Sequence, residues 1–178
     1  VTPDTFQIDV ERIEEMIGPR TKAILAPDLI GNCPDWDAIR EIADRHDLIV
    51  IEDSCDALGQ TLRGTPTGRR ADVALTSFAL SHIITAAGTG GMVCFDRDDW
   101  VDKALMLRRW GRRSEVQLFG STKGVEQRFF SSIEGADGEP DLEYDNIFIF
   151  DEVGWNFEPS EISAAFGPIT LRINHEAL

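Results

Sequence analysis

Residues 48–59 read LIVIEDSCDALG, and this stretch decides the fold of the chain. Its first four residues form a continuous apolar run, which is typical of a buried strand in a parallel sheet. Glu52 and Asp53 follow the run, and a short polar turn continues to Gly59. Because ligands of open α/β sheets bind at the carboxyl ends of the strands, this turn is a candidate site.

Helical and extended patterns alternate on both sides of this strand. Short apolar runs predict further strands, and apolar residues that recur every three or four positions predict helices. The alternation predicts an α/β domain with a mostly parallel sheet flanked by helices. The expected strands are Thr21–Ala26, Leu48–Ile51, Val73–Leu75 and Gly91–Phe95, and the expected helices are Ile8–Ile17, Asp35–Arg45 and Asp98–Trp110.

The pattern changes in the last third of the chain. Glycine, serine and charged residues dominate residues 111–143, which favours irregular structure with its mobile turn at residues 135–140. An extended apolar segment is expected at residues 144–150. A helix is expected to begin near Pro159 and to end before Pro168, because proline lacks the N–H group that a helix interior needs.

The composition narrows the possible partners. The formal net charge is −15, from 17 basic and 32 acidic residues, which argues against nucleic acid or an anionic membrane surface as the main partner. No apolar run reaches the roughly 18 residues needed to span a bilayer. Cys33, Cys55 and Cys94 form no CxxC pattern, so we expect buried free thiols in a reducing cytoplasm, with no disulfide framework or zinc site.

A second polar turn follows a predicted strand at residues 76–91, which read TSFALSHIITAAGTGG. It resembles the segment that carries the cofactor-binding lysine in the DegT/DnrJ/EryC1/StrS family of pyridoxal-phosphate sugar aminotransferases. In that family a Ser-Phe pair precedes the lysine and a glycine turn follows it, so the lysine position falls on His82. A histidine cannot hold the cofactor covalently, but it can move protons near neutral pH. Within the family, this exchange marks the sugar 3-dehydratases, which use free pyridoxamine phosphate.

The two turns supply three cofactor-binding positions through the same resemblance. Residues 52–59 resemble the family signature Glu-Asp-x-x-(His/Gln/Asp)-Ala-x-Gly, which implies that Asp53 pairs with the pyridine nitrogen of the cofactor. A carboxylate there keeps that nitrogen protonated, so the ring can accept electrons from the substrate. The aspartate at position 56 of this signature is similar to the residue that the 3-dehydratase branch has there, which implies that Asp56 also belongs to the cofactor site. Ser77 resembles the serine that binds the cofactor phosphate, for which a hydroxyl beside backbone N–H groups is suited.

A further motif lies near the end of the chain. Residues 154–162 read GWNFEPSEI and resemble the family motif Gly-Tyr-Asn-x-(Arg/Lys)-x-(Ser/Thr)-(Glu/Asp). In the family the asparagine reaches across a dimer interface to the cofactor phosphate of the partner subunit. The resemblance therefore implies the same role for Asn156 and a homodimer, while Glu158 takes the place of the basic residue.

An arginine-rich segment follows the predicted helix that ends at Trp110. It resembles the Trp-Gly-Arg of the dehydratase branch, and a planar guanidinium suits a diphosphate, although solvated arginines at a helix end fit equally well. The iron–sulfur members of this branch carry a cysteine cluster soon after this motif. The last cysteine here is Cys94, so we expect no metal and no iron–sulfur cluster in this segment. The arginines are Arg108, Arg109, Arg112 and Arg113.

Each assigned residue also has a structural interpretation. Asp53 is compatible with a capping role in its turn, Ser77 with a hydrogen bond to the backbone at its strand end, and Asn156 with a turn before a helix. For His82 the alternative is an inactive homologue, and Thr89 stands where the family usually has glutamate. These alternatives stay open at the level of the sequence.

The resemblance implies the large domain of a fold-type I pyridoxal-phosphate transferase, truncated at both ends. Residues 1–110 would form part of the cofactor-binding domain, residues 111–150 an irregular excursion, and residues 151–178 the asparagine motif and the start of a connection to a C-terminal domain. The implied activity is the pyridoxamine-phosphate-dependent removal of the 3-hydroxyl from a nucleotide-linked 4-keto-6-deoxyhexose. The alternatives are a pyridoxal-phosphate sugar aminotransferase and a non-catalytic homologue.

Overall fold

The computed structural model describes residues 1–124 and 130–177 and divides the chain into two compact units. The sheet unit comprises Val1–Asp96 and the chain from Pro159 onward, and the hairpin unit comprises Arg97–Glu158. The domain boundaries inferred from the sequence, after residues 110 and 150, stay a prediction. No helix in the part of the chain that the structure describes has the length and apolar character needed to cross a membrane.

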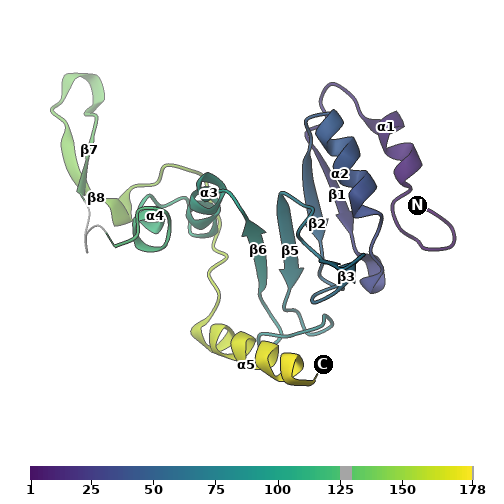
Figure 1. The fold of residues 1–178 in the computed structure, drawn as a ribbon. Helices are drawn as coiled ribbons and strands as arrows, with labels where there is room; N and C mark the ends of the chain where they lie inside the picture. The colour runs from purple at the N-terminus through teal and green to yellow at the C-terminus, as the bar shows by residue number, and fades with distance from the viewer. Residues whose placement is uncertain (125–129, 178) are drawn as a thin grey trace. The chain divides into compact units, whose positions relative to one another are not determined.

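A four-stranded sheet with the order β1-β2-β5-β6 organises the sheet unit (Figure 1). The strands β1 (Ala23–Pro27), β2 (Ile49–Asp53) and β5 (Val73–Ser77) run parallel, and β6 (Gly91–Phe95) runs antiparallel to β5. Each strand lies where a short apolar run predicts it. The mostly parallel sheet of an α/β domain is therefore confirmed.

The helix α2 (Trp36–Arg45) packs against β1 and β2 and provides four of the nine residues of the apolar core (Figure 1). It begins after Asp35, whose carboxylate accepts a hydrogen bond from the backbone N–H of Ala38 at 3.3 Å. Apolar residues at helical spacing then turn toward the sheet, where their burial stabilises the unit. The core cluster consists of Ile13, Ile24, Ala26, Trp36, Ile39, Ile42, Ala43, Leu48 and Val50.

The strand β2 departs from its expected burial. Its apolar run predicts a strand covered on both faces, but Val50 and Glu52 are buried while Ile49, Ile51 and Asp53 are half-buried. The face of Val50 belongs to the core under α2. Among the described residues the opposite face is less covered, so the expectation is wrong for that face.

Short elements complete the sheet unit. The helix expected at residues 8–17 is a 3₁₀ turn followed by a single α-turn, because the chain is already extended at Ile17 before Gly18. A small hairpin and another 3₁₀ turn lie beside the central sheet. The bounds are η1 Val10–Arg12, α1 Ile13–Met16, η2 Leu29–Gly31, β3 Thr61–Leu62 and β4 Thr65–Pro66.

The helix α5 (Glu161–Ala177) begins where the sequence predicts a helix. Ser160 caps it, since its hydroxyl accepts a hydrogen bond from the backbone N–H of Ser163 at 3.1 Å. The expectation that Pro168 ends the helix is wrong, because Pro168 lies inside it. One backbone hydrogen bond is lost at the proline, and the turns on both sides continue.

The hairpin unit contains α3 (Asp98–Arg108), as expected, and structure that the sequence pattern does not reveal. A helix α4 (Ser114–Phe119) and a hairpin of β7 (Phe130–Ile133) with β8 (Leu142–Asp145) replace the irregular region expected there. The extended segment expected at residues 144–150 is wrong in part, because it is interrupted by a 3₁₀ turn, η4 (Asn146–Phe148). A further 3₁₀ turn, η3 (Ala136–Gly138), joins the two strands of the hairpin.

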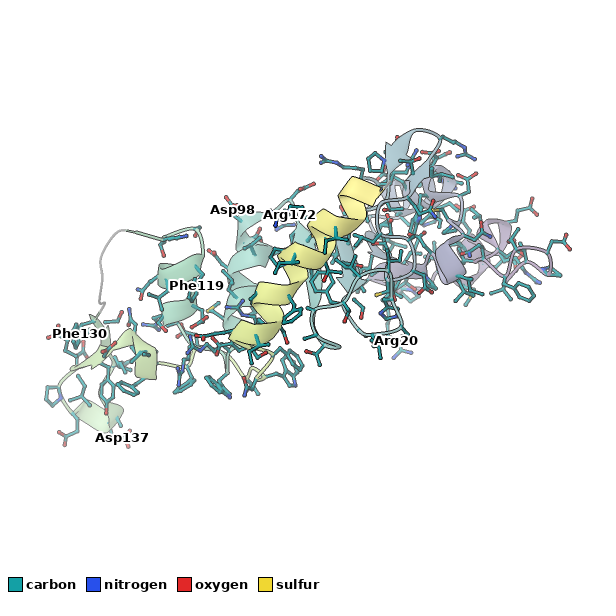
Figure 2. All side chains as sticks on the ribbon, turned by 90° about the horizontal axis from the view of Figure 1, so that it is seen from below. Arg20, Asp98, Phe119, Phe130, Asp137 and Arg172 are labelled. Carbon is teal, nitrogen blue, oxygen red and sulfur yellow. The ribbon has the colours of Figure 1, made fainter. Side chains whose placement is uncertain are left out.

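The side chains of the β7–β8 hairpin explain why the sequence does not predict its strands. Its strands read FSSI and LEYD, which show no regular alternation of apolar and polar residues. Many apolar side chains of this unit are exposed, and Phe119 and Phe130 each expose more than half of their surface (Figure 2). A period-2 pattern arises only where one face of a strand is buried, and this hairpin has no such face among the described residues.

The three cysteines are free thiols, as expected. Their burial is less than expected, because Cys33 and Cys55 are half-buried and Cys94 is exposed. Cys94 lies on β6, which has a single neighbour in the described sheet and therefore presents an open edge.

Candidate functional site

Three parallel strands end at the same edge of the sheet. The register places Pro27 of β1 beside Asp53 of β2, and Asp53 beside Leu75 of β5. Backbone hydrogen bonds extend the pairing into the turns, from the Asp28 N–H to the Asp53 carbonyl and from the Ser54 N–H to the Leu75 carbonyl, each at 2.9 Å. The polar turns that follow these strands therefore meet at one edge, which is the ligand-binding edge of open α/β sheets.

Asp53 is the last residue of β2 and is half-buried. One of its carboxylate oxygens accepts a hydrogen bond from the backbone N–H of Cys55 at 3.1 Å. This contact orients the carboxylate and realises the capping interpretation of Asp53. It leaves the carboxylate at the strand edge, where a protonated ring nitrogen is a suitable partner.

The thiol of Cys55 forms a hydrogen bond with the carboxylate of Asp53. Burial, together with the hydrogen bond and the negative charge of Asp53, raises the pKa of Cys55 to about 12. The backbone of Ser77 lies close enough to oppose this shift, so Asp53, Cys55 and Ser77 form one cluster. The thiol therefore stays protonated at neutral pH and is a poor nucleophile there.

Asp56 connects two turns of the edge. Its carboxylate accepts a hydrogen bond from the backbone N–H of Ile30 at 3.2 Å. Ile30 and Gly31 both have positive φ angles, 56° and 74°, and a Cβ atom at Gly31 would lie 3.0 Å from the Asp56 carbonyl oxygen. Asp56 thus holds a strained turn against the strand end, and its predicted contact with a cofactor stays a prediction.

Ser77 ends β5 and opens the loop that leads to β6. Its hydroxyl accepts a hydrogen bond from the backbone N–H of Ala79 at 3.1 Å. The loop closes on itself through the Phe78 N–H, which donates to the Gly90 carbonyl at 2.9 Å. A hydroxyl and a tight run of backbone amides at a strand end are the groups that bind a phosphate in such sites.

His82 lies inside this closed loop and is half-buried. Its backbone N–H donates to the Ala79 carbonyl at 3.1 Å, which fixes the backbone at this position. The ring nitrogen Nδ1 is buried and has no hydrogen-bond partner in the part of the chain that the structure describes. A buried polar atom without a partner is uncommon, so this nitrogen is available to an ordered water or to a ligand group.

The far end of the loop is held by α5. The Thr89 hydroxyl lies 3.3 Å from the Ser163 hydroxyl, so the position where the family usually has glutamate contacts the start of this helix. Ala87 and Gly88 take positive φ angles of 57° and 87° just before it. The turn that carries Thr89 is therefore fixed by two positive φ angles and by the contact with Ser163.

Asn156 belongs to the hairpin unit and is exposed. The backbone on either side of it pairs with the end of α3, since the Trp155 N–H donates to the Leu107 carbonyl and the Phe157 N–H to the Arg108 carbonyl, both at 2.8 Å. Two residues later, Glu158 forms an ion pair with Arg109 at 3.2 Å. The structure holds Asn156 in an extended segment, and its contact with a cofactor phosphate stays a prediction.

A buried pair of carboxyl groups beneath the strand edge was not found by sequence reasoning. Asp28 and Glu52 are each 1% exposed. The Trp36 indole N–H donates to Asp28 at 2.7 Å, and the Gly68 backbone N–H donates to Glu52 at 2.7 Å. The available signal was Glu52 itself, an acid in phase with the core residue Val50 on β2.

Burial governs the protonation of this pair. It raises the pKa of Glu52 to about 7, and the charge of Asp28 adds to that shift. Burial also raises the pKa of Asp28, although its hydrogen bonds to Trp36 and Glu52 oppose this shift. The pair therefore keeps a proton near neutral pH, which avoids two negative charges in a buried space. No group of His, Cys, Asp and Glu that could hold a metal ion occurs among the described residues.

The donor set fits a pyridoxal-type cofactor that is not covalently bound. Asp53 offers a carboxylate for a ring nitrogen, Ser77 a hydroxyl for a phosphate, and His82 a buried nitrogen that lacks a partner. Lysine is not found in this loop, and Lys22 directly precedes β1 at the opposite end of the strand.

Comparison with known proteins identifies the chain. The sequence model of the DegT/DnrJ/EryC1/StrS aminotransferase family matches residues 1–173. The chain belongs to this family. Its fold is that of the fold-type I pyridoxal-phosphate enzymes, as the resemblance of the two strand-end turns implies.

Individual relatives include both aminotransferases and dehydratases. The GDP-perosamine synthase of Caulobacter vibrioides is 40% identical over 141 residues, which are 79% of this chain and 38% of that protein. The dTDP-4-dehydro-2,6-dideoxy-D-glucose 3-dehydratase of Saccharopolyspora spinosa is 34% identical over 161 residues, 90% of this chain and 34% of that protein. This chain thus spans little more than a third of the length of these relatives.

A solved dehydratase has the same fold. The Escherichia coli GDP-4-keto-6-deoxy-D-mannose-3-dehydratase, solved with bound hydrated pyridoxal phosphate, superposes with a TM-score of 0.75 at 26% identity. The match covers 97% of this chain and 41% of that one.

Proposed function

We propose that the protein is a pyridoxamine-phosphate-dependent 3-dehydratase of a nucleotide-linked 4-keto-6-deoxyhexose. The observation that carries the proposal is His82, which stands where the family motif has the cofactor-binding lysine and whose Nδ1 is buried without a partner among the described residues. A lysine would hold the cofactor covalently, whereas a histidine leaves the cofactor amine free for the substrate. Relatives named as 3-dehydratases support this assignment.

When bound, the cofactor supplies an amine for the C4 ketone of the sugar and a ring that accepts electrons. Asp53 would hold the proton on the ring nitrogen, and its orientation by the Cys55 N–H suits that task. Ser77 and the backbone of its turn would bind the phosphate. His82 would take a proton from the C4′ carbon of the cofactor and deliver it to the C3 hydroxyl, which leaves as water.

The neighbouring groups leave this proton transfer to His82. The Cys55 thiol, with its pKa raised to about 12 by burial and by Asp53, stays neutral throughout. Asp56 is bound to the Ile30 N–H and would support the turn.

Asn156 would bind the cofactor phosphate of a partner subunit in a homodimer. The reaction would take place in the cytoplasm, where free thiols persist.

An aminotransferase is the second candidate, favoured by the 40% identity to a GDP-perosamine synthase. This reaction needs a lysine that reaches the cofactor. The chain has three lysines, and Lys22 lies at the opposite end of β1. Lys103 pairs with Glu152 within the hairpin unit. A homologue without activity is the third candidate.

The decisive test is an absorbance titration of the full-length protein with pyridoxal phosphate, followed by borohydride treatment and mass spectrometry. We expect cofactor binding that dialysis reverses and no cofactor–lysine adduct. In His82→Asn we expect the loss of dehydration by at least about 100-fold with cofactor binding retained, because general acid–base catalysis typically contributes that much.

Two variants sharpen the interpretation. His82→Lys should form a borohydride-stable adduct at position 82, which would show that the cofactor lies at this loop. An adduct on a native lysine would assign the protein to the aminotransferases. Unchanged turnover in His82→Asn would remove the proposed role of His82, and the absence of any cofactor binding would favour the inactive homologue.

A further inference from the structure

Four arginines lie at and just after the C-terminal end of α3 in the hairpin unit, and three of them are neutralised by carboxylates. Arg108 and Arg109 share the fully buried Glu115, at 3.4 Å and 3.2 Å. Arg113 binds both oxygens of Asp151, at 2.8 Å and 2.6 Å. These arginines are part of the internal structure of the unit.

Arg112 is different, although it lies in the middle of this cluster. Within residues 1–124 and 130–177 no carboxylate pairs with it and no hydrogen bond reaches its guanidinium, whose Nε is buried. Its guanidinium instead lies over the rings of Trp110, at 4.7 Å, and Phe150, at 5.6 Å. The other half-buried arginines in the described part of the chain, which all have a carboxylate partner, are Arg40, Arg70, Arg108, Arg109 and Arg113.

The turn at Trp110 and Gly111 holds the guanidinium of Arg112 over the two rings. Trp110 has a positive φ of 58°, and Gly111 follows with a φ of 81°. A Cβ atom at Gly111 would overlap the Glu152 carbonyl, so only glycine fits this turn. The bridge between Arg112 and Phe150 then brings the second ring alongside the guanidinium.

This environment suits an anion. A half-buried guanidinium has lost part of its hydration, and aromatic faces compensate only a fraction of that loss. Its planar set of N–H donors matches two oxygens of a phosphate, which makes arginine the preferred residue for phosphate recognition. Trp110 and Phe150 are 39% and 53% exposed, so the cluster that holds the guanidinium lies at the surface of the hairpin unit.

We propose that Arg112, whose guanidinium lies over the rings of Trp110 and Phe150, binds a phosphate group of the nucleotide diphosphate that carries the sugar substrate. The nature of the ligand rests on the proposed function, because a nucleotide-linked sugar brings two phosphates into the protein. Arg109 cannot take this role, since Glu115 and Glu158 already occupy it.

The test measures equilibrium binding of GDP, dTDP and inorganic pyrophosphate to the full-length protein by isothermal titration calorimetry. Arg112→Gln should weaken the binding of a nucleoside diphosphate at least about tenfold, because a charge-assisted contact to phosphate is lost. Arg112→Lys keeps the charge but not the planar donors and should fall between this variant and the wild type. It also keeps the test usable where Arg112→Gln does not fold.

Arg97→Gln is the matched control. Arg97 also stacks on a tryptophan, Trp100, at 4.6 Å, but it pairs with Asp99. Its substitution should leave the affinity unchanged. Equal affinity in folded Arg112→Gln and wild type, or no diphosphate binding to the wild type, would overturn the proposal.

The binding measurement separates this inference from the proposed reaction. Loss of diphosphate affinity in Arg112→Gln supports the phosphate site even where no dehydration is detected. In an active enzyme, the same variant should raise KM for the nucleotide sugar about tenfold with kcat nearly unchanged. An intact dehydratase whose KM and diphosphate affinity do not respond to Arg112 would keep its function and lose this site.

Discussion

The sheet unit and the hairpin unit differ in what holds them together. In the sheet unit, helix α2 buries a continuous apolar cluster against parallel strands. In the hairpin unit, Ile149 is the one buried apolar side chain that the described residues contribute, and the other buried side chains are polar. The buried polar residues are Ser114, Glu115 and Asn146.

This difference shows two routes to order. In the sheet unit many apolar side chains share one continuous cluster, so the loss of a single contact leaves most of the buried area in place. We therefore expect this unit to open only as a whole. The hairpin unit depends on directional contacts, such as the shared Glu115 and the pairing of Trp155 with Leu107, and each of these has little redundancy. We therefore expect faster hydrogen exchange in the hairpin unit than in β1, β2 and α2.

The largest effect is expected from Gly111→Ala, which would break the hairpin unit alone. The added Cβ overlaps the Glu152 carbonyl and also meets an unfavourable positive φ. We expect a loss of more than about 3 kcal/mol in the local free energy of unfolding. Hydrogen-exchange mass spectrometry should show the loss of protection in α3 and α4, with protection in α2 retained.

Gly124→Ala is the control for this substitution. Gly124 has a similar φ of 87°, but no atom of the residues that the structure describes lies within 4 Å of the added Cβ. Its cost should be about 1 kcal/mol, the backbone contribution alone. Equal costs for the two variants would contradict the role assigned to the contact between Gly111 and Glu152.

The converse prediction concerns the sheet unit. Ile39 on α2 is completely buried, and Ile39→Ala should cost about 3 kcal/mol through lost burial and the cavity that remains. Chemical denaturation measures this loss, and Met16→Ala, at a position 83% exposed, should cost almost nothing. A comparable loss of exchange protection in α3 would show that the two units do not open independently.

The smallest effect is expected in how the free energy of unfolding depends on pH, and it concerns the buried Glu52 of the sheet unit. Burial holds the pKa of Glu52 at about 7, above its ordinary value of 4.5, so the folded state binds this proton more tightly than the unfolded state does. The stabilisation is fully present below pH 4.5 and is lost as the pH rises toward 7. We expect a decrease on the order of 1 kcal/mol between pH 5 and pH 8.

Glu52→Gln tests the origin of this dependence. The amide keeps a carbonyl for the Gly68 N–H and stays neutral at every pH, so the slope of stability against pH should flatten. A slope identical to that of the wild type would mean that other groups cause it. Denaturation midpoints at several pH values give the answer.

The two units also differ in how far the sequence predicts them. The strands and α2 follow from apolar periodicity, because burial on one side imposes a period that the sequence must carry. The hairpin of β7 and β8 has no such period, since its side chains are mostly exposed. Pro168 misleads in the other direction, because a helix can lose one hydrogen bond and continue.

The candidate site shows the same limit. The motifs predict Asp53, Ser77 and His82, and the structure places Asp53 and Ser77 at the ends of two neighbouring strands and His82 in the loop after the second strand. The Asp28–Glu52 pair and the stacking of Arg112 were not predicted, because each depends on residues that are distant in sequence. Trp36 and Gly68 complete the carboxyl pair, and Phe150 completes the stack.

The thiol of Cys55 has a practical consequence. With a pKa of about 12, it reacts slowly with alkylating reagents at neutral pH, whereas the exposed Cys94 is directly accessible to them. Once Cys94 is blocked, the rate at which a maleimide labels Cys55 measures how often the strand edge opens and exposes this thiol. A native reporter therefore stands two residues from Asp53, and slower labelling on addition of a ligand would reveal binding without a substrate assay.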